Sequence, residues 1–230
     1  MNRAYSYIIL LVSILSLCKV SADAQTHYSS NIALGVKGGV DLSRVNFSPS
    51  VKQSFVLGGN AGVTFRYIEE NHFGLIAEVN FEQRGWKEDF EEYPFKYSRT
   101  INYVQIPLLA HIYFGRRGKF FINLGPEVWF NIGESTKANF DYTNLSSVEG
   151  FPEKLRITYQ YGLAADKKVD FGISAGLGGE FNITKRNSIY IEGRFYYGLG
   201  NVVKSGRADS FRGSNSMSIM LSAGYWFRVK

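Results

Sequence analysis

The side chains that could support acid–base chemistry are few and widely separated in the sequence. The histidines are His27, His72 and His111, and carboxylates gather at Glu82, Glu88, Asp89, Glu91 and Glu92. Catalysis by a general base or an activated nucleophile requires the base within hydrogen-bonding reach of the reacting group. The histidines are expected in the leading segment, in a turn and in the interior, all remote from the carboxylates. The sequence therefore predicts that the protein is not an enzyme.

Metal and cofactor chemistry is not expected either. Asp89, Glu91 and Glu92 could offer oxygen atoms to a calcium ion, but their spacing matches no ligand loop, and a solvated acidic loop is the preferred interpretation. Cys18 is the only cysteine, and we expect it to be removed with a signal peptide. The mature chain would then have no disulfide, thiolate metal site or cysteine nucleophile. A lipid anchor at Cys18 ranks second, because Leu17 is bulky for a lipid-attachment box.

The start of the chain has the pattern of a secretory signal peptide. A basic start precedes a short apolar core at residues 8–17, and residues 22–24 place small side chains where a signal peptidase cuts. The apolar run ends at Lys19, short of the ~20 residues that a spanning helix needs. We therefore predict a cleaved signal peptide over residues 1–24 and a single domain over residues 25–230.

Eight later segments alternate apolar and polar residues, which is the pattern of a β-strand with two different faces. In each of them the apolar set is regular and the opposite set is polar or charged. The predicted strands are Ile32–Leu42, Phe55–Ile68, Phe73–Arg84, Thr100–Phe114, Phe120–Ile132, Val169–Ile183, Ile189–Gly200 and Ser216–Arg228.

The connections between these strands are alternately short and long. Glu69–His72, Gly115–Lys119 and Thr184–Ser188 are tight turns, whereas the other connections are longer, up to Gly133–Lys168. This asymmetry is typical of a bacterial outer-membrane barrel with short periplasmic turns and long extracellular loops. We predict an all-β fold, an eight-stranded antiparallel up-and-down transmembrane barrel in the Gram-negative outer membrane, with a periplasmic N-terminus. A soluble lipocalin-like barrel is the alternative, since alternation alone does not identify the wet face.

The polar face carries charges of both signs, and an eight-stranded barrel is only wide enough for its own side chains. We therefore predict a plugged interior with paired buried charges and no general diffusion pore. Arg66 and Arg194 are expected to pair with members of the set Glu78, Glu127, Glu180 and Glu192. The predicted interior network comprises Lys37, Asp41, Arg66, Glu78, Glu82, Glu127, Glu180, Glu192 and Arg194.

Aromatic residues gather near both ends of the predicted strands, as in the two interfacial belts of a membrane barrel. Those near the short turns are Tyr67, Phe114, Phe120, Tyr190, Tyr225 and Phe227, and those near the long loops are Phe55, Phe81, Trp86, Trp129 and Tyr197. Alternation over residues 155–161 predicts a hairpin that continues beyond the membrane. The candidate loop contacts are Trp86, Phe90, Tyr93, Phe95, Phe140, Tyr142, Tyr159 and Tyr161; packing of these rings on one another, as a cap on the barrel mouth, is the slightly preferred alternative.

Five motifs follow one another along the predicted strands. They are GVKGGVDLS at 35–43, YVQIPLL at 103–109, NLGPE at 123–127, DFGISAGLG at 170–178 and EGRFYYGL at 192–199. Together they resemble the PorT-like outer-membrane β-barrel family common in Bacteroidota, over nearly all of the mature chain. The resemblance implies an eight-stranded barrel, and the family's namesake takes part in protein secretion. One departure is the tail at 228–230, which follows the aromatic residues on which such barrels usually end.

The chain is basic, with a net charge of +6, but its charges are dispersed. Arg116, Arg117, Lys119, Lys185 and Arg186 fall in the short turns, where solvated charges are the preferred interpretation and lipid phosphates the alternative. No basic face interleaved with stacking aromatics suggests nucleic acid. We expect a monomer in contact with outer-membrane lipids and with envelope or secretion-complex proteins. Its expected role is structural or interaction-based, assisting secretion or assembly; the alternative is a small-molecule-binding or narrow transport barrel that uses its extracellular mouth.

Overall fold

Long strands account for most of the chain. The computed structural model describes residues 31–90, 93–152, 161, 165, 168–203 and 211–229, so the predicted signal peptide, with Cys18, and also His27 lie outside it. The elements are β1 (Asn31–Ser48), β2 (Gln53–Ser54), β3 (Val56–Glu70), β4 (Phe73–Glu88), β5 (Tyr97–Gly115), β6 (Gly118–Ala138), the 3-10 turn η1 (Leu145–Ser147), β7 (Val169–Asn182), β8 (Asn187–Gly198) and β9 (Gly213–Arg228). None of the helical segments in these ranges has the length and hydropathy to cross a membrane.

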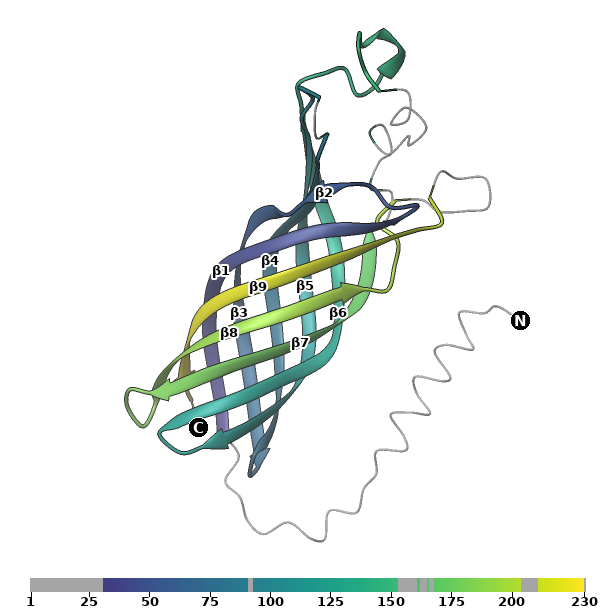
Figure 1. The fold of residues 1–230 in the computed structure, drawn as a ribbon. Helices are drawn as coiled ribbons and strands as arrows, with labels where there is room; N and C mark the ends of the chain where they lie inside the picture. The colour runs from purple at the N-terminus through teal and green to yellow at the C-terminus, as the bar shows by residue number, and fades with distance from the viewer. Residues whose placement is uncertain are drawn as a thin grey trace, which may run out of the picture.

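The strands form one antiparallel sheet that closes on itself (Figure 1). β1 pairs with β3 on one side and with β9 on the other, and a β4–β5 pairing joins the two ends of the strand order. β2 pairs with the end of β4 and is separated from β3 only by Phe55, so β2 and β3 act as one interrupted strand. The ring therefore has eight strands, which confirms the predicted fold.

The two faces of the barrel differ as the alternation predicts. On β9, Ile219 and Leu221 are 51% and 57% exposed, whereas Ser218 and Ser222 are 1% and 5% exposed. A soluble barrel would turn the apolar set inward. Here the apolar set forms the outer wall, which is the arrangement of a lipid-facing surface, and the lipocalin-like alternative is wrong.

Several strands run further than the sequence pattern predicts. β1 ends at Ser48 rather than Leu42, and β6 ends at Ala138 rather than Ile132. In the β1 extension the pattern is reversed, because Arg44 points outward while Val45 is buried inside. A polar outer face of this kind suits water rather than lipid. A strand end predicted from the last apolar, lipid-facing residue therefore falls too early.

The pairing of β5 with β6 continues as far as Tyr97 and Ala138. This hairpin projects beyond the rest of the barrel at the end that carries the long loops (Figure 1). The hairpin predicted over residues 155–161 falls almost entirely outside the described residues. The described hairpin is built instead from the extended ends of β5 and β6.

Two apolar clusters lie inside the barrel, one toward each end. The cluster toward the short turns contains Ala33, Ile68, Ile76, Leu109, Tyr113, Phe121, Tyr190 and Trp226. The cluster toward the long loops is larger and mainly aromatic, and its buried members include Phe47, Trp86, Phe90, Tyr97, Trp129, Phe151, Tyr161 and Phe211. Most of the buried charged side chains lie between the two clusters, and they form the first candidate site.

Candidate functional site

The central ionic cluster of the interior is built around Arg194 on β8. Its guanidinium donates two hydrogen bonds of 2.9 Å to Glu78 on β4, and two more, of 3.1 and 2.9 Å, to Glu192 on its own strand. Glu127 on β6 lies 3.7 Å from the same group. Lys37 on β1 donates to Glu78 at 2.6 Å. The cluster therefore joins four strands across the lumen.

A second ionic group lies nearer the short turns. Arg66 on β3 donates to both carboxylate oxygens of Glu180 on β7, at 2.5 and 3.2 Å. Ser188 donates to the same carboxylate at 2.6 Å, and the Arg66 guanidinium carbon lies 4.7 Å from the centroid of the Trp226 ring. Both oxygens of Glu180 are therefore occupied.

Arg84 on β4 forms a third ionic group, and the predicted network omits it. Its Nε donates to Glu82 at 2.6 Å, and Asp41 lies 3.9 Å away. Its guanidinium carbon lies 3.4 Å from the centroid of the Trp129 ring and 4.0 Å from that of Tyr196. The signal was present in the sequence, because Arg84 alternates in phase with Glu82 and therefore points to the same face.

Neutral amides connect the charged groups, and sequence analysis did not single them out. Asn80 donates to Glu78 and to Gln105, both at 2.8 Å. Gln105 in turn donates to Glu127 at 2.5 Å. Buried carboxylates need such donors, because a charge removed from water is costly unless each oxygen finds a partner.

His111 belongs to this interior rather than to a rim. Its Nδ1 lies 2.7 Å from Asn123 Oδ1, and Asn123 Nδ2 donates to Glu192 at 2.8 Å. The imidazole is 1% exposed. A general base must reach a substrate, and this one is enclosed by the barrel wall and its own neighbours.

The structure places the entire predicted interior network inside the barrel, since every member is buried. Arg66 and Arg194 find glutamate partners within the expected set, whereas Asp41 makes no hydrogen bond with either carboxylate oxygen. An internal cavity beside Glu78 and His111 measures ≈ 10 Å³, about the space that one water molecule needs. The arrangement can therefore hold the strands in register and close the lumen.

The second candidate site is the aromatic cluster at the long-loop end. Phe95 and Phe151 have ring centroids 5.1 Å apart, and those of Tyr97 and Tyr161 are 4.9 Å apart. Tyr161 donates from its hydroxyl to Glu88 at 2.5 Å. Burial raises the pKa of Tyr97 to about 12, and burial beside the Glu88 carboxylate raises the pKa of Tyr161 well above its usual value.

The candidate loop contacts do not share one environment. Phe90, Phe95, Phe140, Tyr142 and Tyr161 pack within the aromatic cluster, which matches the capping alternative. Tyr93 is 47% exposed, and Tyr159 lies outside the described residues.

Three of the aromatic assignments are wrong. Trp86 is not a loop residue, because it lies on β4 with its side chain fully buried. Trp129 and Tyr190 also face the interior instead of an interfacial belt. All three residues alternate in phase with the inward-facing side chains of their strands, so the pattern itself predicts that they point inward. The assignment to the belts rested on their aromatic character and their position near strand ends.

The acidic segment offers no metal site in the part of the chain that the structure describes. No group of three or more candidate ligands is found there. Glu91 and Glu92 lie outside the description. The Asp89 backbone amide donates to Lys52 O at 3.1 Å.

A closed barrel with an apolar outer wall and a charged, filled interior defines an integral outer-membrane protein. Residues 23–204 match the model of the outer membrane protein beta-barrel domain family. The chain therefore belongs to that family. This match identifies the outer membrane protein beta-barrel domain family and does not distinguish the PorT-like proteins within it.

Comparison with solved structures finds small outer-membrane barrels. Neisserial surface protein A is 13% identical, with 85% of this chain and 97% of that chain covered and a TM-score of 0.46. Ail of Yersinia pestis, in complex with a heparin analogue, is 14% identical, with 85% and 99% covered and a TM-score of 0.41. OprG of Pseudomonas aeruginosa is 11% identical, with 85% and 95% covered and a TM-score of 0.45. No curated protein sequence matches the chain.

Proposed function

We propose that this protein is a closed outer-membrane barrel that acts by binding another envelope protein at its long-loop end. The observation that carries the proposal is the filled lumen. Arg194 contacts carboxylates from β4, β6 and β8, and the internal cavity beside this cluster measures ≈ 10 Å³. With this cluster filling its centre, the barrel is expected to act through its surfaces.

The long-loop end has the features of a contact surface. The hairpin of β5 and β6 extends beyond the barrel, and the described aromatic residues of the flanking segments, such as Phe90 and Phe151, pack together in the aromatic cluster. Tyr93 stands exposed beside that cluster. Aromatic residues are enriched at protein interfaces because they bury a large area at low conformational cost.

The proposed orientation has the long loops outside the cell and the short turns and the N-terminus in the periplasm. It is supported by the general rule that the long loops of such barrels are extracellular and their short turns periplasmic. The resemblance to PorT-like proteins supports a secretion or assembly complex as the class of partner. In this proposal a single barrel, surrounded by outer-membrane lipid, presents the hairpin to that partner.

The alternative is a small-molecule-binding or narrow transport barrel that uses its extracellular mouth. Transport would need a continuous polar path past the central ionic cluster, where the described cavity measures ≈ 10 Å³. A stable conductance in planar bilayers would favour this alternative over the proposed function.

The proposal can be tested by photo-crosslinking in living cells. A photoreactive phenylalanine analogue is placed at Tyr93 or Glu149, which are both exposed at the long-loop end, and at Phe195 on the lipid-facing wall as the matched control. We expect one discrete protein adduct from Tyr93 or Glu149 and none from Phe195. Absence of any protein adduct from both loop positions, in barrels that are folded in the membrane, would overturn the proposal.

A further inference from the structure

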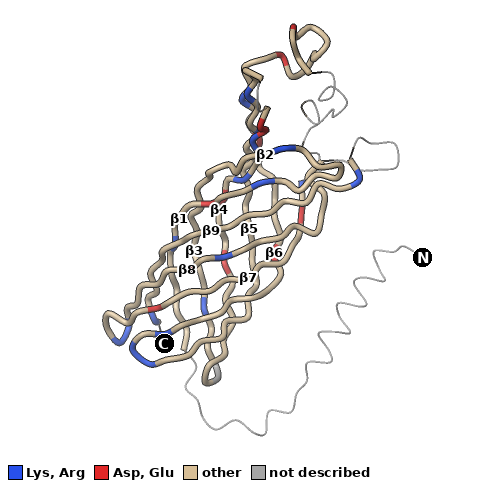
Figure 2. Tube along the Cα trace, in the orientation of Figure 1, with Lys and Arg blue, Asp and Glu red and all other residues tan. Residues whose placement is uncertain are grey.

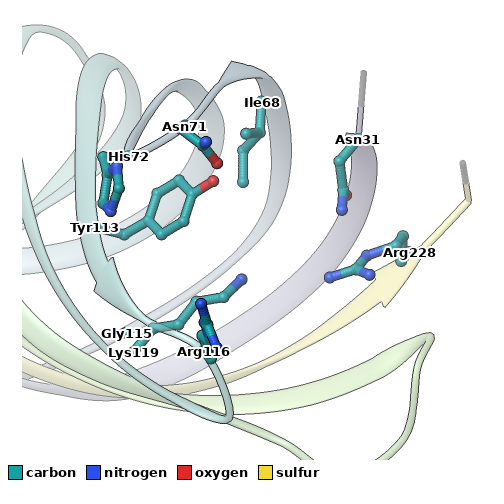
Figure 3. Close-up of a pocket in the computed structure, with 9 residues that line it drawn as sticks. All are labelled: Asn31, Ile68, Asn71, His72, Tyr113, Gly115, Arg116, Lys119 and Arg228. Atoms are coloured by element: carbon teal, nitrogen blue, oxygen red, sulfur yellow. The ribbon is translucent and has the colours of Figure 1, made fainter. Parts of the chain in front are cut away.

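The mouth of the barrel at the short-turn end contains a pocket that the proposed function does not use. Its volume is ≈ 370 Å³. Figure 3 shows its lining, which comes from β1, β3, β5, β6 and β9 and from the turns between them. The lining residues are Asn31, Ile68, Asn71, His72, Tyr113, Gly115, Arg116, Lys119 and Arg228.

The pocket is positively charged. Arg116, Lys119 and Arg228 contribute three cations, and no lining side chain that the structure describes is acidic. Figure 2 shows the same concentration of basic residues at this end of the barrel. The nearby carboxylate of Glu180 is buried above the mouth, and Arg66 occupies both of its oxygens. Glu180 stands opposite Lys119 in the β6–β7 pairing and attracts it, but it forms its ion pair with Arg66, so the three lining cations still outnumber this one carboxylate.

Two of the cations point into the mouth and not toward lipid. Lys119 and Arg228 alternate in phase with the inward side chains, whereas their neighbours Phe120 and Phe227 are exposed on the outer wall. In Figure 3 the Lys119 amine and the Arg228 guanidinium approach the same space from opposite sides. Lys119 Nζ lies 4.9 Å from the centroid of the Tyr113 ring, a contact that holds it over the pocket.

These three cations have no close ion-pair partner among the described residues. Within the described chain, Arg116, Lys119 and Arg228 form no ion pair, although Lys119 lies opposite Glu180 in the β6–β7 pairing. The Nε atom of Arg228 and the Oδ1 atom of Asn31 are buried without a hydrogen bond. Partly buried cations of like charge repel one another and lose hydration. A site of this kind gains stability when an anion with several acceptor oxygens enters it.

We infer that this mouth pocket binds a phosphate ester, with Arg228 and Lys119 as the principal contacts and Arg116 at the rim. Arginine matches the oxygens of a phosphate group with two parallel hydrogen bonds, and lysine adds a point charge. The volume exceeds that of a bare phosphate ion, so the remaining space fits the alcohol portion. Asn31 and Asn71 offer amide groups to its hydroxyls. The ester could be a soluble metabolite or the headgroup of a phospholipid that reaches over the rim.

The experiment uses the mature protein, folded in a detergent that contains no phosphate. Calorimetric titration with sn-glycerol 3-phosphate and with inorganic phosphate, at constant ionic strength, tests the soluble source. Native mass spectrometry after incubation with phosphatidylglycerol tests the lipid source. The variant K119Q/R228Q removes the inward cations, and Arg117→Gln is the matched control, because Arg117 is on the same turn but does not line the pocket. The single variant Lys119→Gln provides the readout if the double variant folds poorly.

We expect wild-type protein to bind at least one of these phosphate esters, and K119Q/R228Q to weaken that binding at least tenfold, while Arg117→Gln changes it less than twofold. In phosphate-free buffer the double variant should unfold at an equal or higher temperature than wild type, since it removes unpaired like charges. If Lys119 and Arg228 had only a structural role, the double variant would unfold at a lower temperature than wild type. Binding of neither ester, or equal binding by wild type and K119Q/R228Q, would overturn the inference.

Discussion

Replacing Arg194 by methionine should destabilise the barrel far more than an apolar-for-apolar replacement on its outer wall. Methionine keeps most of the volume but removes two hydrogen bonds to Glu78, two to Glu192 and the 3.7 Å contact with Glu127. Among the described ion pairs, Glu78 keeps one with Lys37, whereas those of Glu127 and Glu192 are with Arg194 alone. Breaking a buried pair by removing one partner costs about 3–5 kcal/mol, which is roughly a hundred- to several-thousand-fold in the unfolding equilibrium.

The measurement is equilibrium unfolding by urea in lipid vesicles, followed by tryptophan fluorescence. Phe195→Leu is the matched control, because Phe195 is the next residue along β8 and faces outward. Lipid chains are as apolar as a leucine side chain, so exchanging one lipid-facing apolar residue for another should cost less than about 1 kcal/mol. The reasoning would be refuted if Arg194→Met cost no more than Phe195→Leu.

A double-mutant cycle adds a second test of the same pair. Combining Arg194→Met with Glu78→Gln removes the cation together with its principal carboxylate partner. The double variant should be more stable than the sum of the single losses predicts, by about 1–3 kcal/mol, as for residues in direct contact. Strict additivity would show that the two groups do not interact in the folded barrel.

Three further results are expected. Leu124→Arg places a charge on the lipid-facing wall near its middle and should lower the free energy of unfolding in vesicles by about 2–4 kcal/mol; unchanged stability would contradict the assignment of faces. Gly85→Ala should cost about 1–3 kcal/mol, because its Cβ would meet Arg99 O at 1.8 Å, whereas Gly133→Ala, with nothing within 4 Å, should be nearly neutral; equal effects in thermal unfolding would argue against this close approach. In planar bilayers the wild-type protein should show no large, stable conductance, and a reproducible open channel would disprove the plug.

Alternation alone was sufficient to predict the barrel wall. Side chains on a strand point to opposite faces in turn, so the phase of Leu221 against Ser222 determines which of them meets lipid. The number of strands followed from the same pattern together with the turns. The strand ends were harder to predict, because beyond the membrane the outer face becomes polar, as at Arg44, and the signal used to define a strand disappears.

The interior could be predicted as a set but not as pairs. Which glutamate meets Arg66 depends on the register and stagger of strands far apart in sequence, and Glu180 is 114 residues away. Arg84 was predictable as an interior residue, because it alternates in phase with Glu82, whereas its packing against the Trp129 and Tyr196 rings depends on strands far apart in the sequence. The pocket at the short-turn mouth needed coordinates, because its lining comes from five strands and their turns.

The three tryptophans provide the most direct test of the central claim, that the apolar set faces lipid and the interior is sealed. Trp86, Trp129 and Trp226 are the only tryptophans in the chain, and all of them face inward. Lipids with brominated chains quench tryptophans that touch them. We predict that wild-type emission in brominated vesicles stays close to that in ordinary vesicles, while Leu124→Trp adds emission that is strongly quenched. Quenching of the wild-type protein to the same extent as the added tryptophan would contradict the account.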